Sequence, residues 1–192
     1  IVGVLAGRVN KSLVGSLNTV GARAVGLCLG DGGVVRTVKT TRFAFDPGRV
    51  GECDTAAHGS ASLLRLLLRE RYLPVIASIG LDDAGHFLNV NADDAGAGLA
   101  AALGASALVL LTDVRGVLDG SKRIVHELTP SRIEQLIASG EVSGGMIPKV
   151  RAAAAVVTES GVPVVILSGD DGSLAEFLAG NIVGTRIVPE GA

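Results

Sequence analysis

A lysine that follows two glycines is the residue best placed for chemistry in this sequence. The segment from Ser143 to Lys149 reads SGGMIPK, and its two glycines let backbone amides approach an anion closely. The proline predicts a helix that begins beside the lysine. Because a cation near the positive end of a helix is locally unfavourable, Lys149 favours a compensating anion such as phosphate. The alternative is a lysine that points into solvent, where the unfavourable effect is small.

Two further polar segments stand at the ends of apolar stretches. The segment from Asn89 to Asp94 reads NVNADD and precedes a predicted helix, and the segment from Leu110 to Gly116 reads LLTDVRG and ends a predicted strand. Because α/β proteins bind ligands just past the carboxyl ends of their strands, both segments are candidate ligand-binding turns. Each also has an ordinary interpretation. Asn91 or Asp93 could cap the helix, and LLTDVRG could be a plain connection after a strand.

Three familiar site patterns fail the test of context. GAGLAA at residues 96–101 has the spacing of a dinucleotide fingerprint, but it lies inside a predicted helix, which argues against a Rossmann oxidoreductase. The segment from Gly7 to Ser12 lacks both the glycine before Lys11 and the preceding strand that a phosphate loop requires. No metal is assigned to protein ligands, because the histidines are far apart and lack carboxylate or cysteine partners at ligand spacing: His58, His86 and His126.

The composition is that of an α/β protein with many tight turns. Apolar residues make up 48% of the 192 residues, and 27 are glycine. The formal net charge is −2 and no long basic run occurs, so nucleic acid is excluded as a partner. The longest apolar stretches, such as 105–111, are far shorter than the roughly 20 residues of a membrane helix. Cys28 and Cys53 form neither a CxxC motif nor a disulfide scaffold, which favours a cytoplasmic protein.

Hydrophobic periodicity predicts alternating helices and strands. We expect helices at 1–20, 60–71, 92–103, 131–138, 148–158 and 173–178, and strands at 24–29, 34–40, 42–51, 73–79, 87–90, 107–111, 164–167 and 185–188. In the second helix, Ser60 is the expected cap, and five leucines are expected to form the buried side: Leu63, Leu64, Leu66, Leu67 and Leu68. Helices that alternate with buried strands predict mainly parallel pairing, here in one continuous sheet shared by two lobes that meet near Gly104.

The candidate segments, taken together with other motifs, resemble the acetylglutamate kinases of the amino-acid kinase family along essentially the whole chain. The matching motifs are LAGxxNK at 5–11, GLxLGDG at 26–32, YLPVIASIG at 72–80, NVNAD at 89–93, LLTDVxGVLDG at 110–120, GGMIPKV at 144–150 and GTRI at 184–187. The resemblance implies a three-layer α/β sandwich whose mainly parallel central sheet is flanked by helices. It assigns residues 1–104 to a partial substrate-binding and dimerisation lobe, and residues 105–192 to a nucleotide-binding lobe.

The activity implied by the resemblance is transfer of the ATP γ-phosphoryl group to the side-chain carboxylate of N-acetyl-L-glutamate. The products are N-acetyl-L-glutamyl 5-phosphate and ADP, in arginine biosynthesis. By the matching motifs, Lys149 stabilises the transferring phosphoryl group, Asp93 holds the catalytic lysines, and Asn89 binds the amino-acid substrate. Mg2+ is expected to be held mainly by the ATP phosphates. The residues expected to line the nucleotide pocket are Asp113, Val114, Arg115, Gly116, Val117, Leu118, Glu141, Val142 and Ser143.

The start of the chain departs from the family pattern. The sequence opens on Ile1-Val2-Gly3, without the Lys-x-Gly-Gly turn, the second glycine-rich loop or the substrate-binding arginine that precede this point in the family. We expect the natural protein to contain these residues. We also expect residues 1–192 alone to show no kinase activity. Feedback inhibition by arginine stays open, because in this family it accompanies an N-terminal extension.

Two other functions compete with this one. A related kinase that acts on an aminoadipate attached to a small carrier protein would keep the chemistry and change the acceptor. A non-catalytic nucleotide or amino-acid sensor would keep only the fold. The presence of Asp93 and Lys149 argues against the sensor, whereas the missing N-terminal lysine leaves it open. Family members are at least dimers, so a cytoplasmic homodimer is expected.

Overall fold

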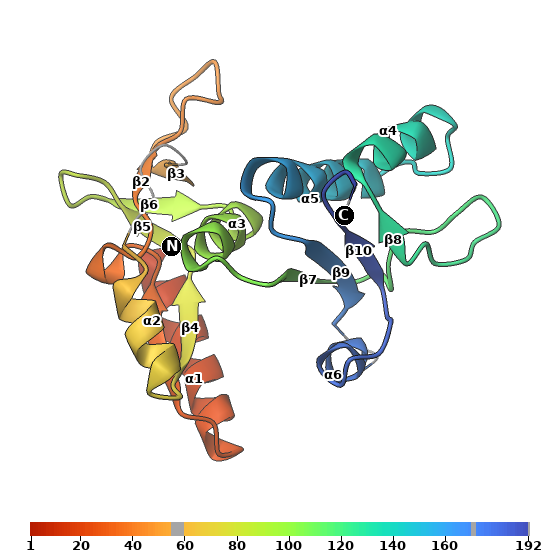
Figure 1. The fold of residues 1–192 in the computed structure, drawn as a ribbon. Coiled ribbons are helices and arrows are strands. Elements are labelled where there is room, and N and C mark those ends of the chain that lie inside the picture. The colour runs from red at the N-terminus through yellow and green to blue at the C-terminus, as the bar shows by residue number, and fades with distance from the viewer. Residues whose placement is uncertain (55–59, 170–171, 192) are drawn as a thin grey trace. The chain divides into compact units, whose positions relative to one another are not determined.

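The structure is a computed structural model that describes residues 1–54, 60–169 and 172–191 (Figure 1). The chain divides into two compact units, Ile1–Leu103 and Gly104–Ala192, which are described separately below. Across the described residues, no helix has both the length and the apolar character needed to cross a membrane.

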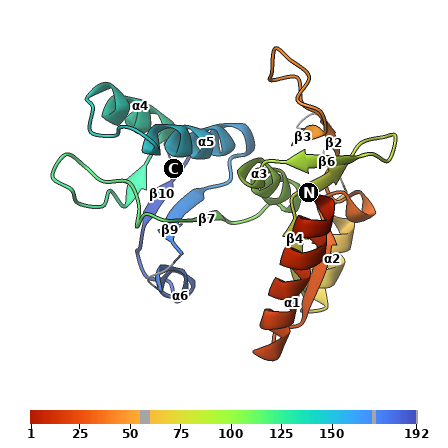
Figure 2. The same ribbon diagram turned by 180° about the vertical axis from the view of Figure 1, so that it is seen from behind.

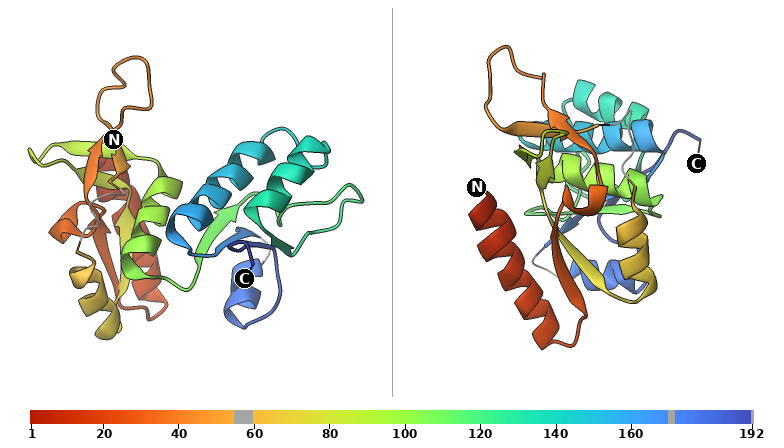
Figure 3. Two further views of the ribbon diagram at one scale, coloured as in Figure 1. Left: turned by 45° about the horizontal axis from the view of Figure 1, so that its top comes forward. Right: turned by 90° about the vertical axis from the view of Figure 1, so that its left-hand side faces the viewer.

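The first unit opens with a helix that packs on a parallel strand pair. A π-helical segment, Gly3–Val9, continues into α1 (Asn10–Thr19), and β1 (Ala24–Cys28) follows. After α2 (Ser62–Arg69), β4 (Leu73–Ala77) pairs with β1 in parallel, with Ala24 opposite Leu73. α1 runs beside both strands (Figure 2), and the right-hand view of Figure 3 shows α1 and α2 on opposite faces of the pair. The helix–strand alternation therefore gives the predicted parallel crossover.

A second sheet of the first unit carries one of the candidate segments. Its strand order is β2 (Thr37–Lys39), β3 (Val50–Cys53), β6 (Phe87–Val90) and β5 (Ile79–Leu81). β3 and β6 are parallel, and the other two pairings are antiparallel. β6 leads into α3 (Ala92–Leu103), which packs on β3. The core of this unit is apolar and nearly inaccessible to solvent: Leu29, Val34, Val35, Leu64, Val90 and Ala95.

The second unit is a three-layer arrangement around a four-stranded sheet. The strand order is β7 (Leu108–Thr112), β9 (Val164–Ser168), β10 (Thr185–Ile187) and β8 (Glu127–Leu128). β7 and β9 are parallel, with Leu108 opposite Val164, whereas β10 is antiparallel to β9 and parallel to β8. Figure 1 shows α4 (Pro130–Ala138) and α5 (Met146–Ser160) on one side of this sheet and α6 (Ser173–Leu178) on the other.

The ends of α4 and α5 differ in how their backbone groups are satisfied. Thr129 caps α4, because its hydroxyl accepts a hydrogen bond from the Arg132 amide at 3.3 Å, and Pro130 occupies the first turn. α5 begins after Gly145, which offers no side-chain cap, and it ends at Gly161, whose φ of 69° suits glycine. Gly144 also has a positive φ, 59°. The first amides of α5, those of Met146 and Ile147, instead donate to the carbonyls of Ser143 and Gly144 in the glycine-rich turn, at 3.4 and 3.3 Å.

The α/β class, with parallel strands flanked by helices, is confirmed. Within the first unit, the described strands form two separate sheets, because β1 and β4 pair only with each other. One sheet shared by both units stays a prediction. The sequence missed β5 and β8 as separate short strands. The predicted strand at 42–51 is mostly a loop, and β3 begins only at Val50. Turn chemistry explains the loop, since Asp46 accepts a hydrogen bond from the Gly48 amide at 2.9 Å.

Two expectations for α2 are also wrong. Ser60 does not cap the helix, because its hydroxyl donates to the Ser62 hydroxyl at 2.8 Å and Ala61 stands at the cap position. Leu66 and Leu68 are 46% and 47% exposed, whereas Leu64 is buried. Five leucines within six residues cover more of the helix circumference than a single packed face can bury.

Candidate functional site

The candidate lysine of the second unit lies in the first turns of α5 and forms an ion pair. The Lys149 ammonium donates a hydrogen bond to Asp113 Oδ1 at 2.8 Å. Asp113 follows Thr112, the last residue of β7, so it stands just past the carboxyl end of a parallel strand. The Thr112 hydroxyl donates to the Val114 carbonyl at 3.0 Å and accepts from the Val114 amide at 3.2 Å. This local turn places the Asp113 carboxylate beside α5.

The anion that Lys149 was expected to need is thus available within the protein. The hydrogen bond from Lys149, a backbone hydrogen bond and the lysine charge hold the pKa of Asp113 below its usual range, so the carboxylate is ionised at neutral pH. The Lys149 side chain is 41% exposed and that of Asp113 is 83% exposed. Because water reaches both groups, the pair is weak and easily exchanged. A phosphate oxygen could replace the carboxylate as the partner of Lys149.

The predicted nucleotide-lining residues divide into exposed positions and core positions. Asp113, Arg115, Leu118, Glu141 and Ser143 are exposed, and Val114 is half-buried. The side chains of Val117 and Val142 belong to the core of the second unit, with exposed fractions of 0% and 3%. These two valines can therefore offer only their main-chain groups to a ligand.

Glu141 joins two loops of the second unit. Its Oε2 accepts a hydrogen bond from the Gly120 amide at 3.0 Å, and its Oε1 accepts from the Ser139 hydroxyl at 2.9 Å. Gly120 closes the LLTDVRGVLDG segment, which also contains Asp113. The structure therefore links the two predicted nucleotide segments through Glu141 and Gly120, and through Asp113 and Lys149.

One buried contact that holds a predicted nucleotide-lining segment of the second unit was missed from the sequence. Thr185 is fully buried, and its hydroxyl accepts a hydrogen bond from the Val117 amide at 2.8 Å. A side chain at Gly116 would meet this hydroxyl, because a Cβ built there lies 2.8 Å from Thr185 Oγ1. The GTRI motif therefore fixes the backbone of the 113–118 segment. The two segments are 68 residues apart, and local sequence patterns carry no signal for such a contact.

In the first unit, Asn89 lies in β6 between two neighbouring strands. It stands opposite Val50 of β3 and Ile79 of β5. Asn89 also lines an open surface pocket of about 460 Å³, whose wall includes Arg49, Ile79 and Phe87 and also the first two residues of the chain, Ile1 and Val2. A pocket of this volume can admit a small molecule.

The helix cap beside Asn89 is Asn91, and this leaves Asp93 available. Asn91 Oδ1 accepts hydrogen bonds from the amides of Asp93 and Asp94, at 2.8 and 3.4 Å. Asp93 is exposed in the first turn of α3, and its carboxylate forms no hydrogen bond or ion pair with another described residue. Its ion pairing with catalytic lysines stays a prediction.

The described residues contain no group of three or more histidine, cysteine or acidic side chains that could hold a metal ion, and His58 lies outside the described residues. Both cysteines are free thiols, and burial, followed by the nearby Asp94 charge, raises the pKa of Cys53 to about 11. A protonated Cys53 is a poor nucleophile, so it does not belong to the candidate site.

Comparison with known proteins assigns the chain to a family. The model of the amino acid kinase family matches residues 2–168. The chain belongs to the amino acid kinase family. Its relatives within the family include the acetylglutamate kinase of Bradyrhizobium sp. strain BTAi1, 44% identical over 176 residues, which cover 86% of this chain and 58% of that protein. Another is the acetylglutamate kinase of Yersinia enterocolitica, 43% identical over 189 residues, which cover 98% of this chain and 72% of that protein.

A solved structure has a similar fold. The crystal structure of smu.665 from Streptococcus mutans UA159 aligns with a TM-score of 0.73 at 28% identity, over 97% of this chain and 69% of that chain. This amino acid kinase chain thus spans about three fifths to three quarters of the length of the relatives it matches.

Proposed function

We propose that the protein phosphorylates the side-chain carboxylate of N-acetyl-L-glutamate with ATP, as a step of arginine biosynthesis. The observation that carries this proposal is the 43–44% identity to proteins named acetylglutamate kinase over most of the chain. The reaction breaks the bond between the γ-phosphorus and the bridging oxygen of ADP. A carboxylate oxygen of the substrate forms the new bond to phosphorus, and ADP leaves with the bonding electron pair.

Lys149 is the group of this chain with the clearest role in that step. When ATP binds, a γ-phosphate oxygen replaces Asp113 as the partner of the ammonium, which then stabilises the charge on the transferring group. The exposed Asp113–Lys149 pair supports this exchange, because neither group is buried with its partner. Backbone amides of the Ser143–Gly145 turn add donors at the start of α5. Magnesium bound to the ATP phosphates would neutralise further charge on their oxygens.

The first unit holds the acceptor in this proposal. Asn89 binds the amino-acid substrate in the pocket that it lines, and Asp93 holds the lysine ammonium groups in place. The residues expected to line the nucleotide pocket are those named above at 113–118 and 141–143. We further propose that the protein is a cytoplasmic homodimer, with 1–104 in the substrate-binding and dimerisation lobe and 105–192 in the nucleotide-binding lobe.

ADP release by the full-length protein tests this function, with N-acetyl-L-glutamate and with glutamate as separate acceptors. Hydroxylamine traps an acyl phosphate as a hydroxamate. We expect hydroxamate that depends on N-acetyl-L-glutamate and disappears in Lys149→Ala. ATP binding without any ADP release would instead support the sensor, and hydroxamate formed only with a carrier-linked acceptor would support the related kinase.

A further inference from the structure

A single arginine ties three elements of the first unit together. The Arg42 guanidinium pairs with Glu52 of β3, with 2.9 Å between Nε and Oε2. It also donates from Nη1 to Asp94 Oδ2, at 2.9 Å, in the first turn of α3. Arg42 itself follows β2. A planar guanidinium suits this bridge between two carboxylates, because its donors are fixed relative to each other.

The bridge is anchored at its base by a threonine. The Thr40 hydroxyl donates to Glu52 Oε2 at 2.6 Å and accepts from the Arg42 amide at 3.3 Å. The side chains of Glu52 and Asp94 are only 21% and 34% exposed, although that of Arg42 is 63% exposed. Both carboxylates are therefore partly shielded from water, which weakens the screening of their attraction to the guanidinium.

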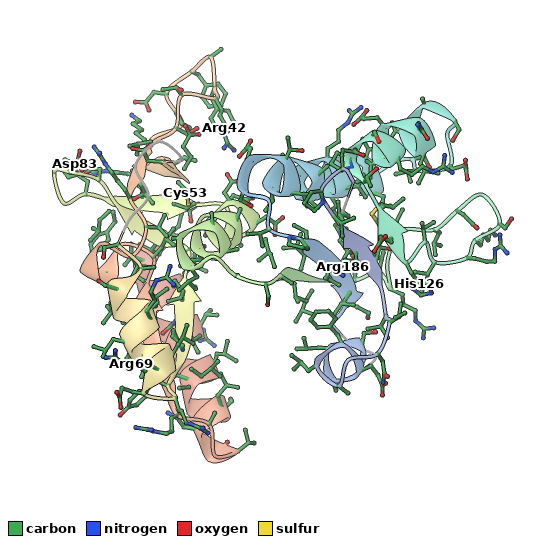
Figure 4. All side chains as sticks on the ribbon, in the orientation of Figure 1. Arg42, Cys53, Arg69, Asp83, His126 and Arg186 are labelled. Atoms are coloured by element: carbon green, nitrogen blue, oxygen red, sulfur yellow. The ribbon has the colours of Figure 1, made fainter. Side chains whose placement is uncertain are left out.

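Asp94 is held at its backbone as well as at its carboxylate. Its amide donates to Asn91 Oδ1 at 3.4 Å, and its carbonyl accepts from Cys53 Sγ at 3.4 Å. Gly98 allows this approach of α3 to β3, since a Cβ there would lie 2.7 Å from Cys53 Sγ. Figure 4 labels Arg42 and Cys53 in this part of the first unit. The first turn of α3 is thus fixed from β3, from its own cap and from Arg42.

The residue that precedes Asp94 is the candidate lysine-holding residue. Because no described side chain holds the Asp93 carboxylate, its direction depends on the backbone of this turn. We propose that Arg42 is a positioning residue: by clamping Asp94 to Glu52, it fixes the first turn of α3 and so aims the Asp93 carboxylate. This inference rests on the proposed kinase function, and it adds a residue that lies outside all of the motifs of the family resemblance.

Steady-state kinetics of the full-length protein test the role of Arg42. We expect Arg42→Ala to lower kcat by about ten- to a hundredfold, the effect of a small misplacement of a catalytic group, while the KM for ATP changes less than about twofold. Arg42→Lys should recover only part of the rate, because one ammonium cannot reproduce the two-carboxylate bridge. In a double-mutant cycle, the variant with both Arg42→Ala and Asp94→Asn should have a kcat no lower than that of the less active single variant, because both changes remove the same interaction.

Arg36 provides the matched control. Its guanidinium also contacts two carboxylates of the first unit, Asp54 at 3.7 Å and Asp83 at 2.6 Å, but none on α3. Arg36→Ala should leave kcat unchanged. A kcat for Arg42→Ala within twofold of wild type, or an equal loss in Arg36→Ala, would overturn the proposal.

A measurement that does not depend on enzyme activity separates this inference from the proposed function. Arg42→Ala should speed amide hydrogen exchange at Asp94 and Ala95 in the first turn of α3, whereas Arg36→Ala should not. If the wild-type protein forms no hydroxamate, the kinase function fails, and the exchange rates still decide whether Arg42 fixes this turn. Unchanged exchange in Arg42→Ala overturns the positioning role whatever the activity is.

Discussion

Two of the described ion-pair clusters, that of Lys149 and that of Arg42, differ in how firmly the cation is held. In the second unit, Lys149 has one carboxylate partner, Asp113, which is 83% exposed. In the first unit, Arg42 bridges two carboxylates that are 21% and 34% exposed, and Thr40 braces one of them. In the proposed roles, the cation that exchanges its partner for a ligand is the loosely paired one, and the cation that fixes a helix turn is the one paired with two partly buried carboxylates.

Removal of Lys149 should have the largest effect. We expect Lys149→Ala to lower kcat by about a hundred- to a thousandfold, the usual loss when one charge-stabilising donor is removed from a transition state. Hydroxamate formation by the full-length protein measures it. Arg151→Ala is the control, because Arg151 is a cation of the same helix that pairs with Glu134 at 2.8 Å. Equal losses in both variants would contradict a specific role for Lys149.

Among these changes, loss of the buried hydrogen bond between the Val117 amide and the Thr185 hydroxyl should reduce the stability of the protein most. Thr185→Val removes the acceptor of the Val117 amide, so we expect the free energy of unfolding to fall by about 1–3 kcal/mol, the cost of an unsatisfied buried donor. Urea unfolding measures this change. Thr158→Val is the control, because the Thr158 hydroxyl donates to the Ala154 carbonyl within its own helix at an exposed position. If the two variants were equally stable, the 113–118 backbone would not depend on Thr185.

Loss of the Asp113 carboxylate, the partner of Lys149, should reduce activity and stability much less. Asp113→Asn keeps the size of the side chain and removes its charge, so we expect kcat to fall less than about tenfold, because an exposed pair contributes little. The thermal midpoint should stay within about 1 °C of wild type by the same argument. Steady-state kinetics and thermal unfolding provide the measurements. A loss of kcat as large as that of Lys149→Ala would show that the Asp113–Lys149 pair is not the weak, exchangeable pair described above.

The smallest expected change is in the titration of Asp113. Its pKa is lowered chiefly by the hydrogen bond from Lys149, so its contribution to stability is present above the usual aspartate pKa and is lost as the pH falls through the lowered one. Lys149→Ala should raise the pKa of Asp113 toward the usual value, as measured by carboxyl carbon NMR titration. The pKa of Glu134, which Arg151 lowers, should not move. An unmoved Asp113 titration would show that the pair does not persist in solution.

Residues close in sequence were predicted well from local patterns. The helix expected at 92–103 is found with those bounds, because an alanine-rich run stands between the cap at Asn91 and Gly104, whose φ is 62°. α4 is also confirmed, since Thr129-Pro130 is a strong start signal. By contrast, the leucines of α2 outnumber the positions that one face can bury, so periodicity alone did not identify Leu66 and Leu68 as exposed.

Contacts between distant residues were beyond the sequence patterns. Lys149 and Asp113 were each singled out, but their pairing across 36 residues was not foreseen. Arg42 reaches Asp94 across 52 residues from a segment that was assigned to a strand. Such contacts depend on how the helices and strands of each unit pack, and helix or strand periodicity carries no information about that packing. The assignments of Asp93, Asn89 and the nucleotide-lining residues stay predictions.

The uncapped start of α5 has a consequence for how ligand and fold depend on each other. A side-chain cap such as Thr129 on α4 stabilises a helix by about 1 kcal/mol, and Gly145 gives α5 none. The first-turn amides of α5 are not free, however, because those of Met146 and Ile147 donate to the carbonyls of Ser143 and Gly144, at 3.4 and 3.3 Å, and Pro148 has no amide hydrogen. An anion bound at this end would compete with these carbonyls for the amides, so that a bound nucleotide would reshape the glycine-rich turn as well as react beside it.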